Sequence, residues 1–584
     1  MTPPPVLGAW TDADVTRFAV RSSADRVTLC LVDGTGERRI AMARDGDVWT
    51  ATTPAAIGDR YGYRTSHDDA KLLVDPYAVE LDRAFVYDAA LGRPGADTSA
   101  LVPYAIVPAP GPRPVPPAAP LFAPGGLVYE LNVRSFTMLH PDVPATLRGT
   151  IAALAHPAIV AHLRKLRVAA IELMPIVAWI DERHLPPLGL VNAWGYNPVV
   201  PMAIDPRLAP GGVAELRDTV AVLRAAGIGV ILDLVFNHSG ESDVAGPTLS
   251  LRGLDDALYY ARTPGGTLIN DTGTGNTLDC ARAEVRALIL ASLRHFAALG
   301  VDGFRFDLAP VLARGPGFDP HAPIFAEIAA DPLLASRVMI AEPWDIGPGG
   351  YRLGEFPADW LEWNDRYRDD VRRFWRGDGD AGTLASRIAG SADVFAGAVT
   401  RTVNFVAAHD GFTLADTVAY EQRHNLANGE GGRDGHGDNR SWNNGVEGAT
   451  DDPSVLARRD ADRRALLVTL FASRGTIMLA AGDEFARTQQ GNNNAYCQDN
   501  AIGWVDWAAR DAALEDHVAA LADIRAAARV GDPAPLADAT WSTLDGRVMT
   551  PADWLDADAF ELRRPGATLR IDRAARLATL TATD

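Results

Sequence analysis

Short apolar runs separated by amphipathic segments fill the middle of the chain. Buried strands that alternate with helices predict a parallel sheet. Seven such strands are clear, and an eighth is expected at Leu361-Glu-Trp-Asn, so the pattern predicts a closed (β/α)8 TIM barrel over residues 127–510. The seven apolar runs begin at Leu127, Val168, Gly229, Gly303, Arg337, Thr402 and Thr476, and helical spacing recurs between them, for example at 213–226 and 283–299.

The pattern differs at both ends of the chain. Residues 1–102 contain short strand-like pieces with a turn at Asp33-Gly-Thr-Gly, which predicts an N-terminal β-sandwich domain. Residues 103–126 are crowded with proline and glycine and predict a linker without regular elements. Residues 511–584 predict a small C-terminal β-domain, with strands around 568–571 and 578–581.

Acidic residues follow several of the predicted barrel strands, where the next loop begins. Asp307 ends Gly-Phe-Arg-Phe-Asp, Glu342 lies in Ile-Ala-Glu-Pro-Trp, and Asp410 lies in Ala-Ala-His-Asp-Gly. A fourth segment, Asp-Leu-Val-Phe-Asn-His, ends at His238. Each alone is more often an ion pair, a cap or a turn. Four at the same end of successive strands indicate an active site, because barrel enzymes hold their catalytic groups there.

The residue types favour glycoside chemistry, which needs one neutral and one ionised carboxyl group. Arg305 and Asp307 are two apart on a strand and point to the same side, so the guanidinium favours the ionised form of Asp307, which suits a nucleophile. Glu342 has apolar neighbours, which resist ionisation and suit a general acid.

Other polar residues of these motifs suit supporting roles. Asp410 could stabilise the developing cation, and His238 and His409 could donate hydrogen bonds to sugar hydroxyls. Asp233 lies within its strand and more plausibly braces the site than reacts.

The composition limits which binding partners and which cellular compartment are expected for the protein. The net charge of -20 disfavours nucleic acid and anionic membranes as partners, whereas a neutral glucan is compatible with it. The cysteines, Cys30, Cys280 and Cys497, show neither metal-ligand nor disulfide spacing, so reduced thiols in a cytoplasmic protein are expected. The start Met-Thr-Pro-Pro-Pro does not resemble a signal peptide, and no apolar run is long enough to span a bilayer.

The four motif segments resemble the signature regions of the α-amylase superfamily of glycoside hydrolases, in order and in strand position. Longer strings between Val128 and Trp507 resemble the bacterial glycogen debranching and isoamylase group, and the N-terminal part resembles the glycogen-binding-type sandwich of such enzymes. The strings begin at Ala193 (Ala-Trp-Gly-Tyr-Asn-Pro), Gly246, Trp363, Asn428, Ser441 and Asn492, and Leu73-Val-Asp-Pro-Tyr-Ala resembles the usual exit from the sandwich.

The resemblance implies a retaining hydrolase acting on α-1,6 branch points of glycogen or limit dextrin. By family position Asp307 is the nucleophile, Glu342 the acid/base and Asp410 the transition-state stabiliser. Arg305, His238 and His409 would hold the sugar, and Tyr196 would stack on it.

No cofactor and no metal is expected. Asn237 occupies a calcium-ligand position of many α-amylases, but one Asn is a poor calcium site and the debranching group generally lacks that ion.

Two alternatives remain open from the residues. The same carboxylates serve α-1,4 hydrolysis and glucan transfer, and a non-catalytic glucan-binding protein on this barrel is disfavoured by the intact triad. The polar segments at Asn428 and Asn492 favour debranching. The preferred branch length, the oligomeric state and glucan binding by the N-terminal domain are not indicated by the sequence.

Overall fold

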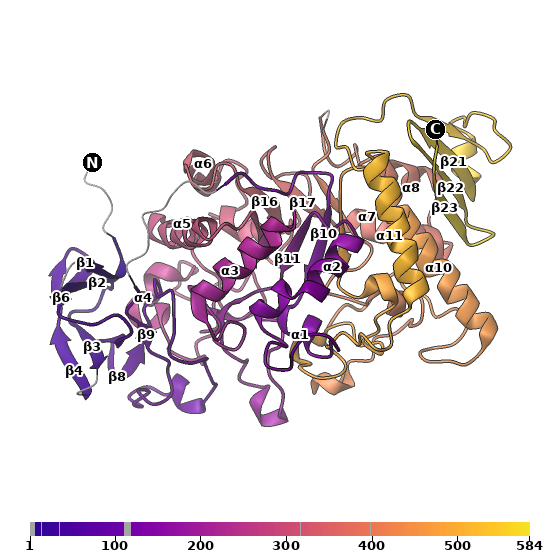
Figure 1. Ribbon diagram of the computed structural model, residues 1–584. Coiled ribbons are helices and arrows are strands. Elements are labelled where there is room, and N and C mark those ends of the chain that lie inside the picture. Colours follow the sequence, from indigo (N-terminus) through magenta and orange to yellow (C-terminus); the bar gives the residue numbers. More distant parts are fainter. Residues whose placement is uncertain are drawn as a thin grey trace.

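The computed structural model describes residues 6–12, 15–33, 36–109, 118–315, 317–397 and 399–583. Paired sheets at the N-terminus, a central barrel and a C-terminal sheet follow one another along the molecule (Figure 1). Residues 110–117 of the predicted linker, residues 34 and 35 of the turn predicted at 33–36, and the first five residues lie outside the described part.

Eight parallel strands close into the predicted barrel. The uncertain eighth strand is present as β17, which pairs with β16 on one side and β18 on the other. Most strands are shorter than the apolar runs that predicted them, because the last residues of each run already belong to loops. In barrel order the strands are β10 (Leu127–Leu131), β11 (Ala170–Leu173), β14 (Gly229–Leu234), β15 (Gly303–Phe306), β16 (Val338–Ala341), β17 (Leu361–Asn364), β18 (Thr402–Asn404) and β19 (Thr476–Ala480).

Helices surround the barrel, and several begin at a side chain that accepts a backbone N–H. Asn364 caps α7 in this way, and Asp511 caps α11. The longer helices are α2 (Pro157–Lys165), α3 (Gly212–Ala225), α5 (Ala283–Ala298), α6 (Pro323–Ala330), α7 (Asp365–Arg376), α8 (Ala381–Ile388), α10 (Pro453–Ala472) and α11 (Ala512–Ala527); shorter ones are α1 (Val133–Thr137), α4 (Leu251–Tyr259), α9 (Leu414–Thr417) and α12 (Asp553–Asp556). None of the helices in the described ranges is both long and apolar enough to cross a membrane.

Alternation along the strands divides the barrel interior into an apolar and a polar level. Val128, Ala170 and Ile231 belong to an apolar cluster inside the barrel. Two residues further along the same strands, toward the carboxyl ends, the inward positions are Glu130, Glu172 and Asp233. This polar level forms the floor of the candidate site.

The N-terminal part is a sandwich of two antiparallel sheets, as predicted. The rings of Phe18 and Tyr61, one from each sheet, meet edge to face with centroids 5.0 Å apart. One sheet contains β1 (Gly8–Asp12), β2 (Val15–Arg21), β6 (Val48–Thr53) and β5 (Ala43–Asp45); the other contains β4 (Gly36–Ala41), β3 (Val27–Asp33), β7 (Arg60–Thr65) and β8 (Asp68–Leu73).

The predicted linker is not wholly irregular. Residues 105 and 106 form β9 (Ala105–Ile106), which pairs antiparallel with β7. The proline-rich stretch therefore begins after the sandwich has gained this extra strand.

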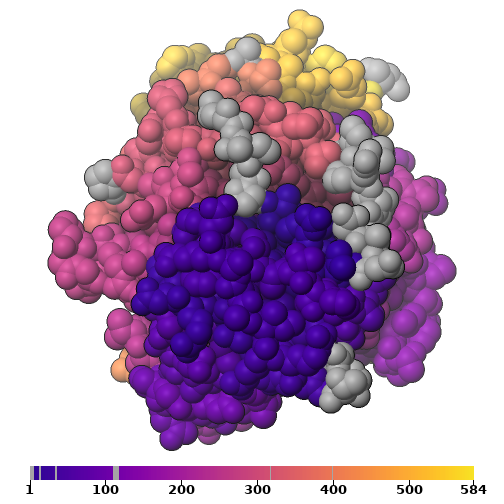
Figure 2. Space-filling model, turned by 90° about the vertical axis from the view of Figure 1, so that its left-hand side faces the viewer, coloured from indigo at the N-terminus to yellow at the C-terminus, as the bar shows by residue number. Residues whose placement is uncertain are grey.

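The sandwich packs directly against the barrel. Its core includes Leu249 and Leu254, which come from the segment around α4. Val74 N donates to Leu249 O at 2.8 Å, and Ser22 Oγ donates to Leu254 O at 2.6 Å. Figure 2 shows the indigo sandwich against the magenta surface of the barrel.

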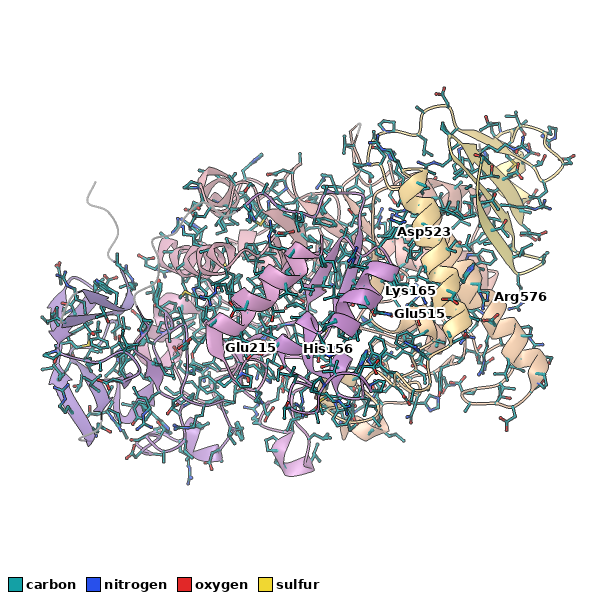
Figure 3. All side chains as sticks on the ribbon, in the orientation of Figure 1. His156, Lys165, Glu215, Glu515, Asp523 and Arg576 are labelled. Atoms are coloured by element: carbon teal, nitrogen blue, oxygen red, sulfur yellow. The ribbon has the colours of Figure 1, made fainter. Side chains whose placement is uncertain are left out.

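The C-terminal segment predicted as a β-domain from residue 511 begins with a helix. This helix, α11, follows β19 and lies beside α10 and α2, and its Glu515 forms an ion pair with Lys165 of α2 at 2.9 Å (Figure 3). By its contacts it is the last helix of the barrel. The antiparallel sheet starts later and packs on α10; it comprises β20 (Thr540–Ser542), β21 (Ala559–Arg564), β22 (Ala567–Asp572) and β23 (Leu577–Ala582).

Candidate functional site

Arg305 lies at the centre of the polar level and contacts three carboxyl groups. Its Nη1 donates to both oxygens of Asp233, at 2.9 and 3.0 Å, and to Oδ1 of Asp307 at 3.0 Å. Its Nη2 lies 3.0 Å from Oε2 of Glu342. The ring of Trp363 lies 4.4 Å from Cζ. The side chain is buried, and in this structure its contacts are with carboxyl groups; a direct contact with the sugar stays a prediction.

Asp307 accepts hydrogen bonds on both oxygens. Arg305 donates to Oδ1, and Asn237 Nδ2 donates to Oδ2 at 2.7 Å and to the Asp307 carbonyl at 2.8 Å. A cation and an amide therefore fix the carboxylate in one orientation. The oxygen of the same amide, Oδ1, contacts Nδ1 of His238.

Glu342 is buried, and its bonds converge on one oxygen. Leu308 N donates to Oε2 at 2.7 Å, and the Arg305 contact reaches the same atom. Leu308 adopts a left-handed conformation with φ 41°, which is uncommon for a leucine. Burial raises the pKa of Glu342 to about 8; Arg305 opposes the rise and the charge of Asp307 adds to it. With Oε2 occupied by donors, Oε1 is the oxygen suited to carry the proton.

Asp410 lies on the rim of the site. Its strand, β18, ends at Asn404, so the carboxylate is carried by a loop and not by the strand end. About half of its side chain (49%) is exposed, compared with 13% for Asp307. Its Oδ2 lies 3.7 Å from Nε2 of His409.

Two aromatic residues surround His409. The ring of Tyr196 stacks on the imidazole with centroids 5.0 Å apart, and Trp194 meets it edge-on at the same separation. The Tyr196 hydroxyl donates to Asp233 at 2.5 Å. One face of Tyr196 is thus covered by His409, and only the other face is left for a sugar.

His238 is buried, and both of its ring nitrogens face protein oxygens. Nε2 lies 2.9 Å from the Tyr196 carbonyl, and Nδ1 contacts Oδ1 of Asn237. A bond to a sugar hydroxyl would require one of these contacts to break. In this conformation His238 contacts Asn237, which in turn donates to Asp307; a contact between His238 and the substrate stays a prediction.

The two polar segments that contain Asn428 and Asn492 lie beside Asp410 and are joined to one another. Asn428 Nδ2 donates to the Asn494 carbonyl at 2.8 Å, and Asn492 Nδ2 donates to Oδ1 of Asn428 at 2.8 Å. Gly411, next to Asp410, donates its N–H to the Asn493 carbonyl at 3.0 Å. The segments therefore form a single wall that reaches the stabiliser position.

Sequence reasoning missed Glu130 and Glu172, which face the barrel interior. Glu130 accepts from Nδ1 of His409 at 2.6 Å and from its backbone N–H at 2.8 Å. Glu172 has no hydrogen-bond partner for either oxygen within the described ranges. A glutamate inside an otherwise apolar strand was the signal, since buried charges are rare without a role. The bond from Leu308 had no sequence signal, because it comes from the backbone.

The described residues contain no group of three or more His, Cys, Asp or Glu side chains arranged to hold a metal ion.

Comparison with known proteins places this geometry in context. Residues 6–78 match the model of carbohydrate-binding module 48, the isoamylase N-terminal domain. The chain is 46% identical over 589 residues to the glycogen debranching enzyme of Yersinia enterocolitica serotype O:8 / biotype 1B, covering 95% of this chain and 87% of that one. It is 45% identical over 588 residues to the glycogen debranching enzyme of Serratia proteamaculans (strain 568), with the same coverage.

The fold is similar to solved structures as well. A pullulanase from Anoxybacillus sp. LM18-11, crystallised with maltotetraose, aligns with a TM-score of 0.69 and 24% identity, over 97% of this chain and 78% of that one. The alignment therefore spans nearly the whole chain.

Proposed function

Because the chain belongs to the glycogen debranching enzymes of the α-amylase superfamily, we propose that it hydrolyses α-1,6 branch points of glycogen or limit dextrin with retention of configuration. The observation that carries the proposal is the pair Asp307 and Glu342. They stand at the ends of adjacent strands, both contact Arg305, and they differ in environment. Glycoside hydrolysis requires such a pair of unlike carboxyl groups.

In the first half-reaction Asp307 attacks the anomeric carbon. Its two donors, Arg305 and Asn237, hold the carboxylate in place. As the bond to the glycosidic oxygen breaks, Glu342 passes its proton to that oxygen, and the leaving chain departs as an alcohol. A covalent glycosyl-enzyme remains on Asp307.

In the second half-reaction water enters at the same position. The Glu342 carboxylate removes a proton from the water as its oxygen attacks the anomeric carbon, and the bond to Asp307 breaks. Asp410, close to the site and partly exposed, stabilises the positive charge that develops in both steps. The enzyme returns to its starting protonation state, and no metal or organic cofactor takes part.

The choice of α-1,6 bonds is supported by the two joined polar segments and by the relatives, which are named glycogen debranching enzymes. A branch point needs space for two chains beside the scissile oxygen. The joined segments around Asn428 and Asn494 shape the mouth on the side of Asp410. Their amide groups can bind hydroxyls of more than one sugar. The proposed partner is therefore a branched α-glucan, including maltooligosaccharides with branches.

The test is to compare substrates with purified enzyme. Glycogen, its limit dextrin, pullulan and linear maltooligosaccharides are incubated separately, and the lengths of released chains are profiled. Release of short linear chains from the limit dextrin, with little action on linear chains, is expected. Faster shortening of linear maltooligosaccharides would instead assign α-1,4 hydrolysis or glucan transfer to the same site.

We also propose a cytoplasmic location. The support is chemical: Cys30, Cys280 and Cys497 are all buried free thiols. Reduced thiols are typical of that compartment.

A further inference from the structure

Glu130 of β10 contacts His409 at two points. Its Oε1 lies 2.6 Å from Nδ1 of the ring, and its Oε2 accepts the backbone N–H of His409 at 2.8 Å. Glu130 is 3% exposed and lies below the ring. Because both of its oxygens are engaged by His409, it acts on the site through that residue.

The imidazole has little freedom to turn. Tyr196 stacks on one face and Trp194 meets it edge-on, both with centroids 5.0 Å away. With Nδ1 held by Glu130, Nε2 is the ring nitrogen that faces Asp410, at 3.7 Å from Oδ2. Whether Nε2 carries a proton decides whether it attracts or repels that carboxylate.

The charges around His409 favour two protons on the ring. Burial lowers the pKa of the imidazole, but Glu130 and Asp410 outweigh burial and raise the pKa to about 9; Arg305 opposes them. The titratable and charged groups that face Glu130 and His409 from neighbouring elements are Glu172 of β11, Asp233 of β14, Arg305 of β15, Asp410, Tyr196 and Arg487.

We propose that Glu130 is a positioning residue that keeps His409 as an imidazolium, so that Nε2–H donates toward Asp410 and the hydroxyls of the bound sugar. This proposal rests on the proposed glucan hydrolysis. A neutral ring bonded to Glu130 through Nδ1–H would present the lone pair of Nε2 to the carboxylate of Asp410. A doubly protonated ring removes that repulsion, and its Nε2–H holds the Asp410 carboxylate in place at the rim of the site.

The first test is the Glu130→Gln variant. Glutamine keeps the shape but removes the negative charge, and its single carbonyl oxygen can accept either Nδ1–H or the backbone N–H of His409, but not both. Without that charge, the pKa of the buried His409 falls, and the ring becomes neutral in the pH range where the wild type stays charged. We expect kcat/KM on limit dextrin to fall by about 10- to 100-fold at pH 8, the scale of a hydrogen bond between charged groups.

The readout is the ratio of wild-type to variant kcat/KM between pH 5 and pH 8. The ratio should shrink to within about threefold at pH 5, where the ring of the variant regains its second proton. Taking the ratio cancels the ionisation of Glu342, which both proteins share. A ratio that is the same at every pH, large or small, would mean that Glu130 is merely structural, and the proposal would be wrong.

Glu172→Gln is the matched control. Glu172 occupies the same level on the next strand, opposite Glu130 in the register. Burial and the charges of Glu130 and Asp233 raise the pKa of Glu172 well above its usual range, which favours the neutral carboxyl. Its replacement leaves the bonds between Glu130 and His409 in place, and its ratio to the wild type should stay flat with pH. A pH-dependent ratio in this control as well would show that the effect is not specific to His409, and would overturn the proposal.

A second measurement uses the wild-type protein and does not depend on the variant folding. Side-chain ¹⁵N spectra of labelled histidines report whether a ring carries one proton or two, and the signal lost in His409→Gln identifies His409. Two protons at pH 7.5 are expected in the wild type. One proton there would overturn the proposal. Because this measurement needs no substrate, it stands even if branched glucans are not cleaved, a result that would refute only the proposed function.

Discussion

At the scale of single residues, the two reacting carboxyl groups share Arg305 but differ in everything else around them. Asp307 receives a donor on each oxygen, whereas Glu342 receives both of its donors on Oε2. This difference, more than their proximity, separates a nucleophile from an acid, because donors favour the ionised form and burial favours the neutral one.

We predict that Asp307→Asn lowers kcat on the order of 10⁴-fold, because the amide keeps the shape but cannot form the glycosyl-enzyme. The variant should melt close to the wild type, since Arg305 retains Asp233 and Glu342 as partners. Initial rates on limit dextrin and a thermal melt check both parts. A folded variant with a rate within tenfold of the wild type, where tenfold is about 1.4 kcal/mol, would contradict the role of nucleophile.

Activity should decline at alkaline pH as Glu342 loses its proton. The pKa of about 8 places the fall of kcat/KM above that pH, since the acid works only in its protonated form. The matched substrate is an α-maltosyl fluoride, because fluoride leaves without a proton. If the fall above pH 8 is as steep with the fluoride as with limit dextrin, it does not come from Glu342.

Metal removal should leave the rate unchanged. Asn237 donates to Asp307 and contacts His238, so its amide is committed to protein groups. Dialysis against a chelator, followed by assay with and without added Ca²⁺, checks this. Loss of activity that Ca²⁺ restores would show a metal requirement that the carboxylate chemistry does not need.

At the scale of elements, the C-terminal sheet is tied to the loop that precedes α10. Arg576, between β22 and β23, donates from Nη1 to Oδ2 of Asp462 at 2.6 Å and to Oδ1 of Asn444 at 2.8 Å (Figure 3). Asp462 is fully buried and also accepts from the indole of Trp442 at 2.7 Å. The hairpin therefore helps to hold the loop that continues the wall beside Asp410.

We predict that Arg576→Ala lowers the free energy of unfolding by about 1–2 kcal/mol, because a buried carboxylate loses a charged donor and the donor itself is partly exposed. Proteolysis should then cut more readily near residues 441–448. Arg570→Ala, an exposed arginine of the same sheet, is the control and should change neither. Unchanged stability in Arg576→Ala would show that the ion pair adds nothing to the fold.

Helices and strands could be predicted from the sequence where their burial leaves a recognisable apolar pattern. Strands buried on both faces are continuous apolar runs, so the barrel could be predicted, even to β17 (Leu361–Asn364). The runs overstated strand length: 405–408 are buried and apolar but follow the end of β18. The segment from 511, predicted as a β-domain, begins with the helix α11, because a helix beside a strand-rich tail gives no sign of its packing partner in the sequence.

The sequence motifs indicate which residues belong to the candidate site but not which atoms contact one another. The sugar-binding roles expected for Arg305 and His238 stay predictions; in the structure Arg305 contacts Asp307 and Glu342, and His238 contacts Asn237. Which partner a polar atom takes depends on three-dimensional distance, and a motif does not contain that information.

At the scale of the whole molecule, the apolar core of the sandwich includes residues contributed by the barrel. Leu254 of α4 lies fully buried among residues of both. Separating the two parts would expose apolar surface on each, which costs roughly 25 cal/mol per Å². We therefore expect the two to unfold together.

Calorimetry of the wild type should show the sandwich and the barrel melting in one transition. Leu254→Ala should lower stability by about 2–5 kcal/mol, as for other buried leucines, without splitting that transition. Labels on Trp49 in the sandwich and on Trp363 in the barrel would follow each part separately. Midpoints that differ between the two labels in the wild type would show independent units.

The guanidinium of Arg305 has a consequence for how this site can evolve. Asp233, Asp307 and Glu342 all depend on the same cation, so the effect of changing one of them depends on what occupies the others. Substitutions at these four positions cannot be additive. A lineage that lost the arginine would gain little by keeping any one of the three acids in its old form. Arg305 and its three acids are therefore expected to be kept or lost together, while the surrounding loops can change and alter the branch length that the enzyme prefers.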